Sequence, residues 1–458
     1  MLNRLLLLFL FALPLLFHSC SKEDQQDDIM PANQLPVIEA PSSVSAVADS
    51  LFTLQLEITD PDGPVPVVSF EGLPDWLSYD AATQVLSGTP ARSDQGNVTI
   101  DIIAADDIGQ RKRTLKIAVL VYLSITEKLN NEVTSKFQFT TSGMLGVSVA
   151  LMTPEDELIT TTRGEHSPGS NNPLDPNYRY RVASVTKSFT ATLILRLAEE
   201  GYFELDDKLF EYLEIPGLDN GIAITIEHLL THTSGMGDHL NDGGFYTGSD
   251  WQTRVWEHQD IYDYTVDQGS FFWPGSSYRY SNTGFYVLGA LAEAVTGQSL
   301  SDLYKSYIFN PLGLDQTLYD DFSSYAEKID SLAENSRAYE YHLTSVGAAG
   351  AIVSTPSDLA KYGNAVYGGD FLTAASKELM ITDYGFAVGG SNYGLGTRLW
   401  DDFGIVHYGH TGSLMDYRSI IMYVPEADVS IALSTNDPHP NWFDLVNGVL
   451  VVVTNHYR

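Results

Sequence analysis

Residues 181–189 have the sequence Arg-Val-Ala-Ser-Val-Thr-Lys-Ser-Phe, which places Ser184 three residues before Lys187. This segment begins a predicted helix, Ser184–Glu200, and residues three apart on a helix share one face. A serine hydroxyl becomes an effective nucleophile when a base takes its proton, and a lysine is such a base if desolvation or another cation lowers its pKa. Because Ser-x-x-Lys arises by chance about once or twice in a chain of this length, an exposed serine beside a solvated lysine is the alternative interpretation.

The second motif, Tyr280-Ser281-Asn282, follows a loop rich in aromatic residues, glycine and proline. A tyrosine near cations can ionise below its usual pKa of about 10 and then move protons. An asparagine side chain both donates and accepts, so Asn282 can hold the lysine amine and a substrate amide together. Taken alone, the motif is also consistent with a loop tyrosine packed on its neighbours.

The third motif, His410-Thr411-Gly412, follows a predicted strand at Gly404–Tyr408. A histidine, a hydroxyl and a glycine that permits close approach of the backbone suit a strand that lines a cleft. A turn with an incidental histidine is the alternative.

The order of these three motifs is typical of one family. From about residue 125 to 455 the chain resembles the penicillin-recognising serine hydrolases: class C β-lactamases, D-alanyl-D-alanine carboxypeptidases, and related esterases and D-aminopeptidases. Three further stretches carry the resemblance, namely Leu229–Gly235, Asn310–Leu314 and Ala348–Pro356. The resemblance implies that residues 124–458 form a β-lactamase/DD-peptidase-like domain, with an antiparallel sheet flanked by helices and a helical subdomain.

Sequence periodicity agrees with this fold. Alternating residues predict strands at Arg418–Val424 and Val429–Ser434, and a helical pattern predicts a final helix at Asn441–Val453.

The resemblance also implies a role for each motif residue. Ser184 would be the acylated nucleophile, and Lys187 and Tyr280 would share the general-base and general-acid work. Asn282 would hold Lys187 and the acyl-side amide of the substrate. His232, within Leu229–Gly235, is expected to be structural.

The strand of the third motif would contact the substrate through His410, Thr411, Gly412 and Ser413. The backbone N–H groups of Ser184 and Ser413 would form an oxyanion hole. Class C β-lactamases usually have lysine where this chain has His410. Because histidine is only partly charged at neutral pH, its hold on a substrate carboxylate depends on its local pKa. We therefore expect acylation by a penicillin but not efficient β-lactam hydrolysis.

The first residues of the chain resemble an export signal. Arg4 precedes an apolar run, Leu5–Phe17, that is shorter than the roughly 20 residues of a membrane-spanning helix. Cys20, the only cysteine, follows this run as the lipidated cysteine does in bacterial lipoproteins. We predict a lipoprotein signal peptide at 1–19 and a lipid anchor at Cys20. The protein would then be exported to the outer membrane, the periplasm or the cell surface; a secretory signal with an incidental cysteine is the alternative.

The segment before the hydrolase-like domain has two parts. Residues 20–35 are polar and acidic, which predicts a tether. Within 36–123, alternating residues at Phe52–Ile58, Val98–Ile102 and Leu115–Val119 predict half-buried strands. This part resembles bacterial immunoglobulin-like and cadherin-like modules, which implies a small all-β sandwich without an activity of its own.

Acidic turn residues leave two interpretations of this module open. Asp60, Asp62, Asp106 and Asp107 offer the oxygen ligands that calcium prefers. Such residues more often cap turns, so a spacer or docking role without metal is favoured.

Composition limits the partners of the chain. Its 458 residues have a net charge of −34. Binding to a phosphate backbone needs an excess of Lys and Arg, so we expect no nucleic-acid partner. No motif indicates a cofactor or a catalytic metal.

Three hypotheses for function follow. The leading one is a serine hydrolase, most similar to D-Ala-D-Ala carboxypeptidases, that attacks a small peptide, β-lactam or ester through acyl-Ser184; a cell-wall peptide is its expected target. An esterase for small acyl esters is the second, because the acyl-enzyme chemistry is shared. The third is a non-catalytic penicillin-binding or adhesion protein, which the joint presence of Ser184, Lys187, Tyr280 and Asn282 disfavours.

Overall fold

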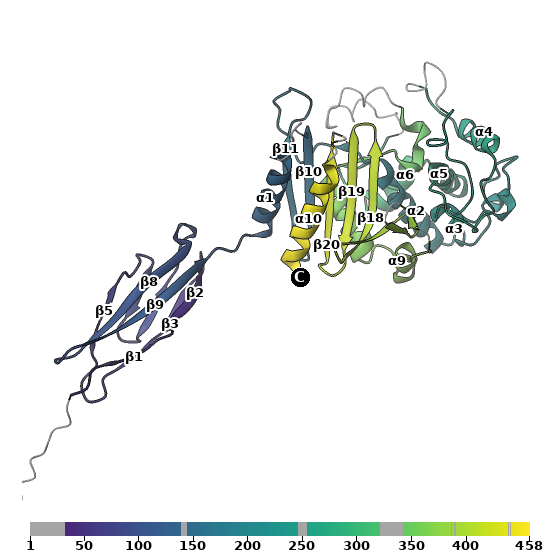
Figure 1. Cartoon of the computed structure of the whole chain (residues 1–458). Helices are drawn as coiled ribbons and strands as arrows, with labels where there is room; N and C mark the ends of the chain where they lie inside the picture. Colours follow the sequence, from purple (N-terminus) through teal and green to yellow (C-terminus); the bar gives the residue numbers. More distant parts are fainter. Residues whose placement is uncertain are drawn as a thin grey trace, which may run out of the picture. The chain divides into compact units, whose positions relative to one another are not determined.

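The chain divides into two compact units, Met1–Tyr122 and Leu123–Arg458, next to the predicted boundary between residues 123 and 124. The computed structural model describes residues 33–138, 144–245, 254–320, 342–385, 387–388, 391–437, 439 and 441–458 (Figure 1). The predicted signal peptide 1–19, Cys20 and all but the last three residues of the predicted tether lie outside the described residues.

The first unit is a sandwich of short strands, as predicted. One sheet has the order β2-β9-β8-β5, a second β3-β7-β6, and a two-stranded pair joins β1 and β4. The strands are β1 Val37–Glu39, β2 Ser43–Val47, β3 Phe52–Gln55, β4 Glu57–Thr59, β5 Val67–Glu71, β6 Leu77–Asp80, β7 Val85–Gly88, β8 Gly96–Ala105 and β9 Gln110–Leu120.

The prediction of a single strand over Phe52–Ile58 is wrong, because this stretch forms two strands, β3 and β4. The chain breaks at Leu56, where β3 ends and pairs with β7, while β4 pairs with β1. Leu56 donates its backbone N–H to the carbonyl of Gln84 and is buried. Alternation alone does not reveal this switch between sheets, because both halves keep the same inward-facing pattern.

Two of the four acidic turn residues of the sandwich, Asp60 and Asp106, cap their own turns. Asp60 accepts from the N–H of Asp62, and Asp106 accepts from the N–H groups of Ile108 and Gly109. Within the described ranges, no three Asp, Glu, His or Cys side chains lie close enough together to hold a metal ion. The described module therefore shows no preformed calcium cluster.

The second unit is built on an antiparallel eight-stranded sheet, in the order β11-β10-β20-β19-β18-β17-β16-β15. These strands are β10 Gly146–Met152, β11 Leu158–Gly164, β15 Ala387–Val388, β16 Ser391–Tyr393, β17 Arg398–Asp402, β18 Ile405–Leu414, β19 Tyr417–Val424 and β20 Val429–Thr435. A small sheet joins β12 Tyr180–Arg181, β14 Ile352–Ser354 and β13 Leu318–Tyr319.

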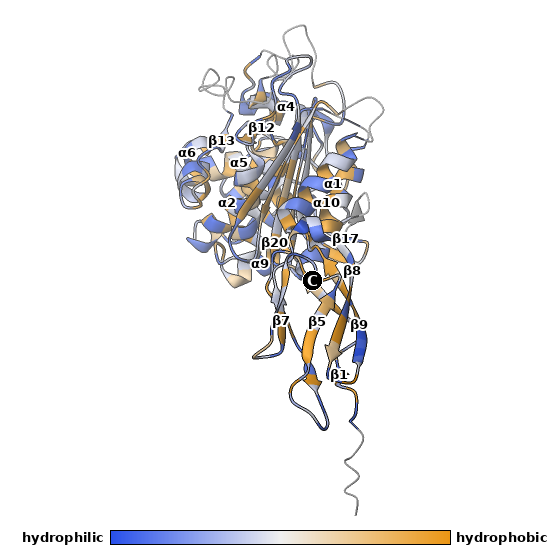
Figure 2. Ribbon diagram, turned by 90° about the vertical axis from the view of Figure 1, so that its left-hand side faces the viewer, coloured by the Kyte–Doolittle hydropathy of each residue, from blue (hydrophilic) through white to orange (hydrophobic). Residues whose placement is uncertain are grey.

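Helices cover both faces of the large sheet (Figure 2). They are α1 Ile125–Gln138, α2 Thr186–Glu199, α3 Ile226–Leu230, α4 His258–Gln268, α5 Asn282–Thr296, α6 Leu300–Tyr304, α8 Pro356–Gly363, α9 Ala374–Met380 and α10 Trp442–Tyr457. None of the helices in the described part of the chain is long and apolar enough to cross a membrane.

Successive residues of β19 face the two cores in turn, as the period of a strand requires. Ile420 and Met422 pack with α1 and α10 on one face, whereas Ile421 packs on the other face in the core that includes Phe189 and Leu193 of α2. This α/β sandwich with helices α3 to α6 set beside it confirms the predicted fold class (Figure 1).

Candidate active site

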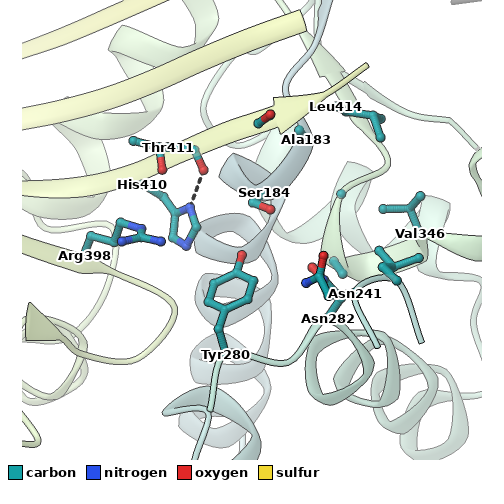
Figure 3. Close-up of a pocket in the computed structure, with 14 residues that line it drawn as sticks. Ala183, Ser184, Asn241, Tyr280, Asn282, Val346, Arg398, His410, Thr411 and Leu414 are labelled. Carbon is teal, nitrogen blue, oxygen red and sulfur yellow. Dashed lines mark hydrogen bonds between the residues drawn. The ribbon is translucent and has the colours of Figure 1, made fainter. Parts of the chain in front are cut away.

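The three sequence motifs meet around one cavity of about 480 Å³ in the second unit (Figure 3). The cavity lies where α2 begins, between β18 and the loop that precedes α5. Its lining comprises Ala183, Ser184, Leu240, Asn241, Tyr280, Asn282, Val346, Ala349, Gly350, Arg398, His410, Thr411, Ser413 and Leu414.

Ser184 lies in a tight turn immediately before α2. A 3-10 turn spans Ala183–Val185, and the α-helix begins at Thr186 rather than at Ser184 as predicted. Ala183 has a φ of 51°, in the left-handed region that L-residues seldom adopt. The turn directs the Ser184 side chain into the cavity, and the start of the helix behind it offers a positive dipole end.

The Lys187 amine is fully buried and has three oxygen neighbours. Its Nζ lies 2.7 Å from Oδ1 of Asn282, 2.8 Å from the carbonyl oxygen of Ala349 and 3.1 Å from Oγ of Ser184. A neutral amine has two N–H donors and one lone pair. With the two hydrogens directed at the Asn282 and Ala349 oxygens, the lone pair faces the Ser184 hydroxyl.

The environment of Lys187 favours this neutral form. Burial lowers the pKa of Lys187 to about 7, Asp238 opposes the shift, and Arg398 adds to it. Lys187 can therefore accept the Ser184 proton near neutral pH.

Tyr280 lies beside Ser184 and Lys187, with its hydroxyl directed toward Ser184 (Figure 3). Lys187 Nζ is 4.9 Å from the centre of its ring. The expectation that cations lower the pKa of this phenol is wrong: burial raises it, and the opposing effects of the contact with Ser184 and of Arg398 are smaller. Tyr280 is consequently protonated at neutral pH and suits the donation of a proton rather than its removal.

Asn282 is the first residue of α5 and is held there by local hydrogen bonds. The side chain of Ser281 caps the helix by accepting from the N–H of Gly284. The buried His232 accepts the N–H of Ser281 at Nδ1, at 3.1 Å, and its ring packs 4.3 Å from that of Tyr280. These contacts fit the structural role expected for His232, although its Nε2 has no hydrogen-bond partner among the described residues.

The third motif lies inside β18 rather than after it. Strand β17 pairs with β18 only as far as Gly409, so residues 410–414 continue beyond the end of that neighbour, and all of them except Gly412 line the cavity. Gly412 brings this segment close to the nucleophile, because a Cβ there would lie 2.0 Å from the carbonyl oxygen of Val182. Ser413 lines the cavity with Ser184, as the predicted oxyanion hole requires.

His410 does not provide the positive charge considered for it. Its Nδ1 lies 2.6 Å from the carbonyl oxygen of Thr411, which only accepts, so we assign the proton to Nδ1. Its Nε2 then accepts from the hydroxyl of Tyr393 at 3.0 Å. Burial, together with the charges of Arg398 and Lys187, lowers the pKa of His410 well below its usual range. Both nitrogens of a neutral ring are thus occupied.

Two residues at the site were not predicted from the sequence. Arg398, at the start of β17, lines the cavity beside His410 and, in the part of the chain that the structure describes, has no carboxylate within 4 Å (Figure 3). Asp238 is buried behind Asn282 and accepts from its Nδ2. Neither residue belongs to a recognisable motif; Asp238 follows the Thr233-Ser234-Gly235 stretch by only three residues, which is the one local hint.

A serine, a buried lysine and a protonated tyrosine around one cavity define a site of the serine acyl-transfer class. Comparison with known proteins identifies the family. The β-lactamase family model matches residues 131–455, and a putative Ig domain model matches residues 35–121. The chain belongs to the β-lactamase family and carries an Ig-like module before that domain.

Individual relatives agree with this assignment. Penicillin-binding protein 4* of Bacillus subtilis is 32% identical over 246 residues, 47% of this chain and 52% of that protein. Penicillin-binding protein 4 of Amycolatopsis lactamdurans is 30% identical over 285 residues, 56% of this chain and 72% of its own length. The chain thus spans about half the length of the first of these relatives.

A solved structure covers a larger share of this chain. The D-amino acid amidase from Ochrobactrum anthropi SV3, complexed with L-phenylalanine, superposes with a TM-score of 0.65 at 27% identity, covering 72% of this chain and 99% of the amidase.

Proposed function

We propose that this protein is a hydrolase that cleaves amides or esters through an acyl-Ser184 intermediate. The observation that carries the proposal is the placement of the Lys187 amine. It lies 3.1 Å from Ser184 Oγ, its other two neighbours are acceptors, and burial lowers its pKa to about 7. Similarity to penicillin-binding proteins and to a D-amino acid amidase supports the same chemistry.

In the acylation step, Lys187 Nζ takes the hydroxyl proton as Ser184 Oγ forms a bond to the substrate carbonyl carbon. The carbonyl oxygen becomes an oxyanion, for which the backbone N–H groups of Ser184 and Ser413 are the proposed donors. The bond to the leaving group then breaks, and Tyr280 gives that group its phenolic proton. The proton on Lys187 restores Tyr280, which leaves an acyl-enzyme and a neutral amine.

Water completes the cycle. It loses a proton to Lys187 as it attacks the ester carbonyl, and Ser184 Oγ leaves with that proton. The sum is one water consumed, one acid and one amine or alcohol released.

For the substrate, we propose a peptide ending in a D-amino acid, of the kind found in cell walls. Arg398 supports this choice, because its guanidinium lines the cavity without a carboxylate partner among the described residues and matches a terminal carboxylate. The neutral His410 is not suited to that task.

A small-acyl esterase is the second candidate. The apolar side chains of Leu240, Val346 and Leu414 line the other part of the cavity, where they suit an uncharged acyl group. Ester cleavage also places less demand on Tyr280, because an alcohol or phenol leaves more readily than an amine.

Intact-mass detection of acyl adducts tests the proposal. Wild-type protein, treated with D-Ala-D-Ala peptides, a penicillin and nitrophenyl esters, should gain the mass of the acyl group, and the Ser184→Ala variant should not. Release of D-Ala compared with release of nitrophenol then ranks peptidase against esterase. Well-folded wild type that forms no adduct with any of these compounds, while still binding penicillin, would indicate the non-catalytic protein instead.

We further propose that the protein is an exported lipoprotein, anchored through Cys20 to the outer membrane, in the periplasm or at the cell surface. The apolar run Leu5–Phe17 directly before the single cysteine supports this. Fractionation of cells that express wild type or Cys20→Ala provides the test: the wild type should sediment with membranes and the variant should not. Membrane association of both would argue against the anchor.

A further inference from the structure

The carboxylate of Asp238 is buried, with the residue 1% exposed, and its hydrogen bonds to other described residues all come from N–H donors. Oδ1 accepts from the backbone N–H of Leu240 at 3.0 Å, and Oδ2 accepts from Nδ2 of Asn241 at 2.6 Å. Nδ2 of Asn282 lies 3.1 Å and 2.9 Å from the two oxygens. Among the described residues no cation lies within 4 Å of this carboxylate.

These contacts decide which way the Asn282 amide faces. Its Nδ2 is directed at Asp238, so its Oδ1 is directed at Lys187, at 2.7 Å. Rotation of the amide by half a turn would set Oδ1 against the Asp238 oxygens, which can only accept, and two acceptors at hydrogen-bond distance repel.

The rotated amide would also disable the base. Its Nδ2 would then donate to the lone pair of the neutral Lys187 amine. That lone pair is the one that faces the Ser184 hydroxyl in the observed arrangement. Asn282, Lys187 and Ser184 would remain in contact, but the Lys187 amine could no longer take the Ser184 proton.

We propose that Asp238 is a positioning residue for acylation, whose carboxylate holds the Asn282 amide in the one orientation that leaves the Lys187 lone pair to Ser184. This inference rests on the proposed acyl-Ser184 chemistry. Asp238 lies behind Asn282, is not among the residues that line the cavity, and orients the base through the Asn282 side chain.

The negative charge of Asp238 has a second effect, because it stabilises the ammonium form and so raises the pKa of Lys187 against the effect of burial. Other charged or titratable groups surround the pair. Those that face Lys187 or Asp238 from neighbouring elements are Tyr280, His232, His239, His410, Arg398, Asp242 and Tyr264.

The Asp238→Asn variant tests the proposal. Its new amide both donates and accepts, so neither orientation of Asn282 is excluded. We expect the acylation rate constant for a nitrophenyl ester to fall about 10- to 100-fold, as for other small misplacements of reacting groups. The substrate dissociation constant should change little, because Arg398 and β18 are untouched. The acidic limb of the pH profile of the acylation rate should move to lower pH, because Lys187 loses an anionic neighbour that favours its protonated form.

Asp242→Asn is the matched control. Asp242 lies on the same loop with a side chain that is 8% exposed, but it pairs with Arg279 and with the backbone N–H of Asp238 rather than with Asn282. A loss of loop structure should therefore affect both variants, in thermal unfolding and in rate, without moving the acidic limb. Equal rate losses in the two variants with no shift of the limb, or an unchanged rate in Asp238→Asn, would overturn the proposal.

A reciprocal exchange provides the test if Asp238→Asn does not fold. Asn282→Asp alone sets two carboxylates against each other, whereas Asn282→Asp combined with Asp238→Asn restores a donor and an acceptor at this contact. The exchange should acylate faster than Asn282→Asp alone at alkaline pH, where Lys187 is neutral despite its new anionic neighbour. No gain would overturn the inference. Wild type that is never acylated would instead overturn the proposed function itself.

Discussion

Lys187 and Arg398 are two basic side chains of the site, one buried behind Ser184 and one lining the cavity, and they differ in burial and in hydrogen bonding. Lys187 is fully buried, its amine meets three oxygens, and burial lowers its pKa to about 7. Arg398 is half-buried, donates to the hydroxyl of Ser391 and, among the described residues, has no carboxylate within 4 Å. The difference matches the two tasks proposed for them: the Lys187 amine serves as the base, and the Arg398 guanidinium binds a substrate carboxylate.

Removal of the base should have the largest effect. In Lys187→Ala the acylation rate should fall by about 1000-fold, because general-base catalysis typically contributes 10²–10⁴-fold. The wild-type rate should rise with pH through about 7, since only the neutral amine accepts the serine proton and Lys187 titrates there. That rise should be absent from the variant. Stopped-flow acylation between pH 5 and pH 9 measures both; a Lys187→Ala variant that retained the rise would show that another group is the base.

The proton donor should come next. In Tyr280→Phe, turnover of a peptide amide should fall about 100-fold, whereas turnover of a nitrophenyl ester should fall much less. An amine must be protonated to leave, and a nitrophenolate need not be. Steady-state assays of both substrates provide the ratio. Equal losses for amide and ester would contradict the assignment of Tyr280 as the acid for the leaving group.

Arg398, the proposed partner of the substrate carboxylate, should affect substrate binding rather than the rate of the chemical steps. In Arg398→Gln, KM for a peptide with a free terminal carboxylate should rise about 10-fold, as expected for loss of a charge-assisted pair. Its amidated form and a neutral ester should be affected little. The amidated peptide is the matched control. A similar rise in KM for all three substrates would contradict the proposed contact between Arg398 and the terminal carboxylate.

His410 should produce the smallest change. Because its ring is neutral and both nitrogens are occupied, His410→Gln should alter KM for the same anionic peptide by less than about threefold, and equally at pH 5.5 and pH 8. A strong rise in KM at pH 8 relative to pH 5.5 in the wild type, abolished by this substitution, would restore the cationic role to His410.

Sequence motifs are sufficient to find the residues that perform the proposed chemistry. Ser184, Lys187, Tyr280 and Asn282 are each predicted from short patterns. In the structure Ser184, Tyr280 and Asn282 line one cavity, and the Lys187 amine contacts Ser184 and Asn282. The fold class follows from the same resemblance and from the strand and helix periodicity of the second unit. Such patterns are local, and the elements that carry them are long enough to be recognised.

The charges around those residues are not predictable in the same way. Burial and the charges of Arg398 and Lys187 lower the pKa of His410, and these neighbours come from other parts of the chain. The place of Arg398 at the cavity likewise depends on how β17 packs beside β18. The contact of Asp238 with the site cannot be predicted from the sequence, because it depends on the position of Asn282 at the start of α5. A protonation state is a property of a folded neighbourhood, so a linear motif does not contain it.

Ala183 adds a thermodynamic consequence to this picture. A non-glycine residue held in the left-handed region costs about 1–3 kcal/mol, and Ala183, with a φ of 51°, is such a residue and is only 3% exposed. Part of the folding free energy of the domain is therefore used to keep the nucleophile's turn in an unfavourable shape. At this residue thermal stability and activity should therefore oppose each other. Glycine would relieve the backbone strain of Ala183, but it would also make the turn that positions Ser184 more flexible.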